Sequence, residues 1–154
     1  MLDAEQKMKL LISDRPWEHE PDNEEWIDAT TGYKCTIWRH PTHGQLNGYV
    51  AIPKGHRLHG QGYDAFDVEV HGGLTYASED KETGEWVVGF DTNHADDFAP
   101  KMVLLIMQYS SMEDAERELE NRGKYRDWAY VKEQVCSLAR QLKMLNMKDE
   151  GVLK

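Results

Sequence analysis

Histidine and carboxylate residues gather in two short stretches near the middle of the chain. His71 ends the stretch 67–71, and Asp91, His94 and Asp97 follow one another within 91–97. Imidazole and carboxylate groups act as general acids and bases and also bind divalent metal ions. We therefore predict a functional site with His71, Asp91 and His94 as catalytic residues and Asp97 as a ligand-binding residue.

Each stretch belongs to a run in which apolar and polar residues alternate. Val68 and Val70 alternate with polar residues in 67–71, and Trp86, Val88 and Phe90 alternate in 86–91. This period of two predicts two β-strands. In the first strand, alternation would place His71 on the face opposite the valines, together with the carboxylates of 67 and 69. The pair that follows, Gly72-Gly73, would permit a tight turn or the close approach of a ligand.

Three chemistries are open to this cluster. With a divalent metal, two imidazoles and one or two carboxylates could bind zinc or manganese and activate water. Without a metal, His71 or His94 could serve as general base or acid, oriented by Asp91. In a binding pocket, the same groups could hold ribose hydroxyls while Trp86 or Tyr76 stacks on a base. The chain lacks the sequence contexts of a serine or cysteine nucleophile and the fingerprints of Walker-type or dinucleotide loops.

Five further residues are candidates for ligand binding. Glu20 and Asp22 lie in an acidic loop, for which a solvated turn is the simpler interpretation, and His56 lies in a long glycine-rich connection. Arg126 could bind phosphate or carboxylate if the start of the last helix lies against the 71/94 cluster. Asp127 could instead satisfy free amides in the first turn of that helix.

Composition restricts the class of protein. The 154 residues suit a single domain, 1–154, with residues 1–16 and 147–154 expected at its periphery. The net charge of -10 argues against a broad nucleic-acid-binding surface but not against a nucleotide. We find no signal peptide or membrane-length apolar run, and two widely spaced cysteines fit reduced thiols. We therefore expect a cytoplasmic protein that does not interact with membranes and whose apolar run 102–107 could support a homo-oligomer.

The fold class follows from the order of the predicted elements. The predicted strands come first and a long predicted helix comes last. The apolar residues of this helix are spaced in steps of three and four: Trp128, Val131, Val135, Leu138, Leu142 and Leu145. The run 102–109 fits either a strand or a buried helix. We expect an α+β domain in which a mostly antiparallel sheet carries the C-terminal helices on one face.

Five motifs in order give the chain a family resemblance. They are WxxEPD (17–22), LNGYVAIPKGH (46–56), VHGGLTYA (70–77), WVVGFDTNHADD (86–97) and YRDWAYVKEQVCSLARQL (125–142). Together they resemble an uncharacterised family of small proteins encoded by bacteriophages, prophages and bacteria. The resemblance implies an intracellular setting, often a phage-infected cell, and an accessory rather than a virion role. It implies no particular activity.

The chain departs from this family pattern at three positions. Asn47 and Thr92 stand where the family often has cysteines, and Arg57 follows His56 where a proline is usual. If those cysteines were metal ligands, this protein would have lost the metal. A role shared by the whole family is therefore better assigned to His71, Asp91 and His94, with His56 as a fourth candidate.

The predicted function combines the cluster with the resemblance. We expect a phage-type accessory protein whose pocket binds a phosphorylated, nucleotide-like small molecule and could hydrolyse it, countering host defence signalling. One alternative is a non-catalytic nucleotide sponge. The other is an inhibitor that binds a host protein through its acidic surface, so the sequence leaves the question of an enzyme open.

Overall fold

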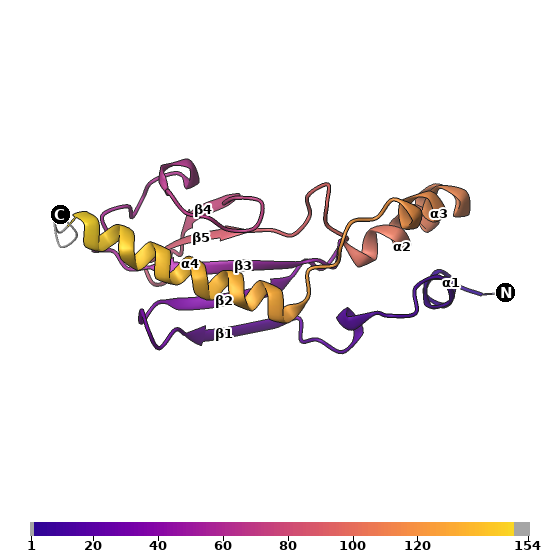
Figure 1. Cartoon of the computed structure of the whole chain (residues 1–154), viewed down its shortest axis with the longest axis horizontal. Coiled ribbons are helices and arrows are strands. Elements are labelled where there is room, and N and C mark those ends of the chain that lie inside the picture. Colours follow the sequence, from indigo (N-terminus) through magenta and orange to yellow (C-terminus); the bar gives the residue numbers. More distant parts are fainter. Residues whose placement is uncertain (1, 150–154) are drawn as a thin grey trace.

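A five-stranded antiparallel sheet forms the centre of the computed structural model, which describes residues 2–149 (Figure 1). The strand order is β1-β2-β3-β5-β4, and every neighbouring pair is antiparallel. The strands are β1 (Asn23–Ile27), β2 (Lys34–Arg39), β3 (Leu46–Ile52), β4 (Tyr76–Glu79) and β5 (Trp86–Phe90). The chain leaves β3 through the long connection 53–75 before β4 and β5 complete the sheet.

Helix α4 (Trp128–Asp149) lies along one face of this sheet (Figure 1). The predicted stripe from Val131 to Leu145 is buried, and Trp128 packs at its edge. The helix passes so close to β3 that a Cβ on Gly48 would lie 2.4 Å from Val135 Cγ2. The α+β class and the C-terminal helix on the sheet are therefore confirmed.

The other three helices lie together beyond one end of the sheet (Figure 1). They are α1 (Ala4–Leu11), α2 (Pro100–Tyr109) and α3 (Met112–Glu120), and two 3-10 turns, η1 (Pro16–Glu18) and η2 (Tyr63–Ala65), lie in the connections. A second apolar cluster that includes Met8, Phe98 and Val103 holds them together. The run 102–109 is therefore helical. Of the predicted peripheral range 147–154, residues 147–149 continue α4 and the rest lie outside the described residues.

The prediction of a strand at 67–71 is wrong. This segment runs along α4 without joining the sheet, and glutamine side chains of the helix take the place of a neighbouring strand. The Glu69 amide donates to Gln141 Oε1 (2.7 Å), and Gln141 Nε2 donates to the Glu69 carbonyl (2.8 Å). Two residues further along the segment, the His71 amide donates to Gln134 Oε1 (2.9 Å). Alternating valines still pack against the core, so the pattern of burial is that of a strand although the pairing is not.

No helix within residues 2–149 combines the length and the apolar character needed to cross a membrane.

Candidate functional site

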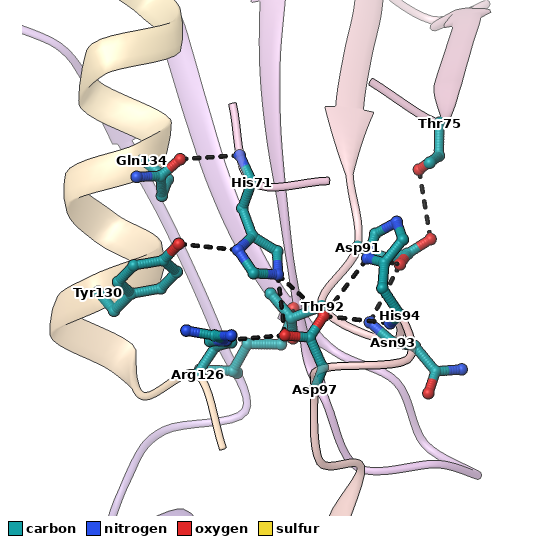
Figure 2. Close-up of polar contacts among 11 residues, drawn as sticks. His71, Thr75, Asp91, Thr92, Asn93, His94, Asp97, Arg126, Tyr130 and Gln134 are labelled. Carbon is teal, nitrogen blue, oxygen red and sulfur yellow. Dashed lines mark hydrogen bonds and ion pairs between the residues drawn. The ribbon is translucent and has the colours of Figure 1, made fainter. Parts of the chain in front are cut away.

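The Asp97 carboxylate lies at the centre of the predicted cluster (Figure 2). Its side chain is completely buried and accepts hydrogen bonds from three segments of the chain. His71 Nε2 lies 2.8 Å from Oδ2 and 2.9 Å from Oδ1, and Arg126 Nε donates to Oδ1 at 2.7 Å. The His94 amide donates to Oδ2 at 3.1 Å. The structure therefore brings together His71, His94, Asp97 and Arg126, which are separated by up to 55 positions in the sequence.

A short backbone pairing places Asp97 beside the start of α4. The Lys124 amide donates to the Asp96 carbonyl at 2.8 Å, and the Phe98 amide donates to the Lys124 carbonyl at 3.0 Å. Gly123 permits this approach, because a Cβ there would lie 2.1 Å from the Asp96 carbonyl carbon. The pairing fixes the loop after β5 against the segment that leads into α4.

His71 is held on both sides of its ring. Besides Asp97 on Nε2, Nδ1 lies 2.7 Å from the Tyr130 hydroxyl, and the side chain is only 12% exposed. The Gly73 amide donates to the Val70 carbonyl at 2.8 Å, which closes a turn with Gly72 at φ +68°. Glycine adopts this left-handed conformation without steric cost. His71 is therefore a fixed group whose ring nitrogens both already have protein partners.

His94 is the more accessible imidazole of the cluster. Its Nδ1 lies 3.3 Å from Asp97 Oδ2 and 3.5 Å from Asp91 Oδ1, and its side chain is 35% exposed. Asp91 in turn accepts from Thr75 Oγ1 at 3.3 Å (Figure 2). Within the described part of the chain, His94 Nε2 has no hydrogen-bond partner. The carboxylates therefore orient this ring while one nitrogen stays available.

Arg126 confirms that the start of α4 abuts the cluster. Its Nε is bound to Asp97, and its guanidinium lies over the Tyr130 ring at 5.4 Å from the centroid. The two Nη groups have no hydrogen-bond partner among residues 2–149, and the side chain is 18% exposed. Asp97 therefore aims a guanidinium whose outer nitrogens could bind an anion. The neighbouring Asp127 instead accepts from the Tyr130 amide at 2.9 Å, which fits the helix-capping interpretation.

The electrostatics of the cluster favour an ionised Asp97. Burial raises the pKa of this carboxyl, but the hydrogen bonds from His71, Arg126 and the His94 amide lower it further, so the net pKa lies below its usual value. Asp91 adds a second carboxylate and Arg126 a single positive charge. With neutral imidazoles, the cluster therefore carries a net negative charge.

Glu20 and Asp22 lie with Arg39, in a separate polar network. The guanidinium of Arg39 contacts Asp22 Oδ1 at 2.8 Å and Glu20 Oε1 at 3.2 Å. Glu20 also contacts the Tyr125 hydroxyl and accepts from the Trp128 amide at 2.9 Å. The two carboxylates thus tie the loop before β1 to β2 and to the first turn of α4, which is a structural arrangement and not part of the His71 cluster.

Three other predicted ligand residues also lie elsewhere. His56 is buried beneath α4, with Nε2 2.8 Å from the Leu142 carbonyl, and burial lowers its pKa. Trp86 donates from Nε1 to the Gln61 carbonyl at 2.9 Å. Tyr76 lines a groove of about 440 Å³ on the sheet face away from α4 and contacts Tyr49 edge-on. The prediction that Trp86 or Tyr76 stacks on a base held by the cluster is therefore not supported, because each ring has other neighbours.

Thr92 and Asn47 both have polar roles inside the protein. The Thr92 hydroxyl is buried and donates to the Leu46 carbonyl at 2.8 Å. Asn47 is also buried, and its amide donates to the Tyr49 hydroxyl at 3.4 Å. Neither side chain hydrogen-bonds to the Asp97 cluster.

Tyr130 and Gln134 were not among the predicted site residues. They belong to a polar stripe on α4 beside the apolar one, whose members are Tyr130, Gln134, Ser137 and Gln141, and Arg126 lies two residues before the helix begins. The steps of four, three and four place the stripe on one side of the helix, a spacing that could have identified it. The stripe, with residues 69–71, lines an open groove of about 550 Å³ beside His71.

One set of side chains has the composition and spacing of a metal site. His71, His94 and Asp97 each offer a ligand atom, and these three atoms lie within 4.8 Å of one another.

Comparisons with family models, with curated proteins and with solved structures found no match to this chain.

Proposed function

We propose that the protein binds a phosphorylated, nucleotide-like small molecule at the Asp97 cluster and hydrolyses a phosphate ester or anhydride bond in it. The convergence of His71, His94 and Arg126 on one buried carboxylate supports this proposal. The phage resemblance adds a setting, the cytoplasm of an infected host cell, in which removal of a nucleotide-derived defence signal would be the use.

Each side chain of the cluster has a part in this proposal. Arg126 binds a phosphoryl oxygen through its Nη groups, because guanidinium matches phosphate geometry and Nε is already fixed by Asp97. His94, on the other side of Asp97 in Figure 2, has a free Nε2, which we assign to the phosphate or to the attacking water. His71 and Tyr130 hold the Asp97 carboxylate in place, so His71 is a positioning residue. The groove along the polar stripe of α4 takes the rest of the ligand.

Turnover of a nucleotide panel tests the reaction. The panel would contain linear and cyclic nucleotides and dinucleotides, and products would be separated by ion-exchange chromatography. We expect the wild type to hydrolyse at least one member and the His94→Ala variant to lose about 10²-fold or more in kcat/KM. His43→Ala is the matched control, since His43 belongs to a separate histidine pair whose rings stack at 4.3 Å. Hydrolysis that survives in His94→Ala would refute the site.

Binding without turnover is the second candidate. Both ring nitrogens of His71 and both oxygens of Asp97 are already hydrogen-bonded, which favours a fixed recognition site over a reactive one. In that case the ligand would be recovered intact from the denatured wild-type protein, and the wild type would form no product. Arg126→Ala would weaken binding of the ligand.

The loop that motivated the acidic-surface inhibitor is only partly available to a partner, because Asp22 is exposed whereas Glu20 is not. Glu20 faces inward to Arg39 and to the helix α4 amide, so it is not presented to a partner.

A further inference from the structure

We infer that the Asp97 cluster binds one divalent transition-metal ion of the zinc or manganese type through His71 Nε2, His94 Nδ1 and Asp97 Oδ2. This inference extends the proposed function, because it names the group that would act on water at the same site. Its test does not depend on turnover.

The spacing of the three ligand atoms carries the inference. His71 Nε2 lies 2.8 Å and His94 Nδ1 lies 3.3 Å from the same oxygen, Asp97 Oδ2, and the three side chains each offer one ligand atom within 4.8 Å of the others. An ion with ligands at about 2.1 Å and ordinary bond angles holds them roughly 3.0–3.4 Å apart. The three side chains therefore need only small shifts to surround one ion.

The hydrogen bond on the far side of His71 supports the same conclusion. Histidine ligands usually donate their second ring N–H to an acceptor, which fixes the tautomer. The Tyr130 hydroxyl lies 2.7 Å from His71 Nδ1 and can accept that hydrogen. In the metal-free protein His71 Nε2 carries the proton that it donates to Asp97 at 2.8 Å. Binding of an ion would place the ring proton on Nδ1, where Tyr130 can accept it, and would leave the Nε2 lone pair for the ion.

Charge and access favour an ion as well. The charges of Asp91 and Asp97 outweigh the single charge of Arg126, so the net negative charge of the cluster favours binding of a cation. Asp91 Oδ1 lies 3.5 Å from His94 Nδ1 and adds negative charge beside the three ligands. Two imidazoles and a carboxylate suit zinc or manganese better than magnesium or calcium, which prefer all-oxygen sites. The exposed side of His94 leaves room for a water molecule, whose pKa such an ion would lower.

Metal binding alone tests the inference. Chelator-treated full-length protein would be titrated calorimetrically with ZnCl₂, MnCl₂ and MgCl₂. We expect one equivalent of Zn²⁺ or Mn²⁺ to bind, with Mg²⁺ much weaker. His94→Ala should weaken binding by more than about 10-fold, and Tyr130→Phe by about 10-fold, because removal of an outer hydrogen bond typically costs that much. Circular dichroism would check that each variant is folded.

The matched control is again His43→Ala, which removes one ring of the other adjacent histidine pair. Retained Zn²⁺ affinity in this variant supports the assignment. The assignment fails if the wild type binds neither ion, or if binding is lost in His43→Ala and kept in His94→Ala. A protein that binds the ion but hydrolyses nothing keeps the metal site and refutes the hydrolase, whereas a protein that hydrolyses a nucleotide but binds neither ion keeps the hydrolase and refutes the metal site.

Discussion

Gly72 should control the position of His94, and substitution with alanine measures that control. A Cβ at Gly72 would lie 2.3 Å from His94 Cε1 and 2.6 Å from Nε2. Carbon atoms in contact are ordinarily about 3.5 Å apart, so the imidazole would have to move by about 1 Å or more. The ring has no room to move toward Asp97, whose Oδ2 already lies 3.3 Å from Nδ1. The methyl group of Gly72→Ala should therefore push the ring out of the cluster.

The neighbouring glycine provides a matched control. Gly73 has φ +79° and Gly72 has φ +68°, so alanine at either position forces an L-residue into the left-handed region. That conformation costs about 1–2 kcal/mol. A Cβ at Gly73, however, meets no atom within 4 Å. Both variants should lose a similar free energy of unfolding from the backbone, and Gly72→Ala alone should disturb His94.

Two measurements separate these effects. Urea denaturation should show both variants destabilised by about 1–2 kcal/mol, with any further loss in Gly72→Ala attributable to the displaced ring. Turnover should fall by about 10²-fold in Gly72→Ala, because a displacement of about 1 Å at a reacting group costs that much, and should stay near wild type in Gly73→Ala. Zn²⁺ affinity should likewise fall in Gly72→Ala and stay near wild type in Gly73→Ala. Equal activity and equal Zn²⁺ affinity in the two variants would refute the placement of His94 against Gly72.

Three further predictions concern the residues that the structure assigns to the scaffold. Glu20→Ala should cost about 3 kcal/mol of unfolding free energy, because it removes the oxygens that accept from the buried Arg39 guanidinium and from the Trp128 amide. Asp22→Ala should cost less than about 1 kcal/mol, since the Asp22 side chain is 83% exposed, and urea denaturation of both variants checks this. Burial lowers the pKa of His56, so the folded protein holds this imidazole neutral. The stability that depends on the neutral ring should be complete above about pH 6.5 and should fall as the pH drops from there through the folded pKa. Denaturation at a series of pH values should show a smaller decline in His56→Gln. Gln141→Ala should speed hydrogen exchange at the Glu69 amide, and unchanged exchange there would contradict the pairing of this segment with α4.

The sequence was sufficient for the elements whose environment is uniform along their length. The apolar stripe of α4 repeats over about five turns, and only a helix on a core explains it. The strands at 34–39, 46–52 and 86–90 likewise alternate against a buried face. The run 102–109 could not be assigned because it is apolar on all sides, and the choice of helix depends on packing against α1 and α3.

The segment 67–71 shows why a strand pattern can mislead. Its valines are spaced as in a strand and they do pack inward. A strand also needs a neighbour for its backbone, and here Gln134 and Gln141 supply the hydrogen bonds from a helix. Those two residues lie more than 60 positions away in the sequence, so no local signal could reveal them. His71 nevertheless kept its predicted position at the end of the segment, next to the turn.

The difference between local and distant partners also explains which of the predicted site residues lie together and which do not. The hairpin of β4 and β5 brings together the chain before β4 and the chain after β5. These two segments carry His71 on one side and Asp91, His94 and Asp97 on the other, so their clustering was local enough to predict. Trp86 and Tyr76 required knowledge of which sheet face α4 covers, because Trp86 packs at the covered core and Tyr76 lies on the opposite face. Glu20 was a candidate ligand residue because the sequence does not distinguish a buried carboxylate that pairs with arginine from one that binds a ligand.

The polar stripe of α4 and the preceding Arg126 explain why the site and the fold are so closely joined. Arg126 and Tyr130 hold the Asp97 cluster, while Gln134 and Gln141 hold the backbone that presents His71. One helix therefore sets the distance between the two loops that carry the imidazoles, and its apolar side fixes that helix on the sheet (Figure 1). Because His71, Asp97 and Arg126 also hold the fold together, their substitution should lower stability as well as the proposed turnover and cannot by itself establish a catalytic part. His94 is the exposed member with no scaffold partner beyond the cluster, so its variants, with Gly72→Ala and Gly73→Ala, are the ones that isolate the chemistry.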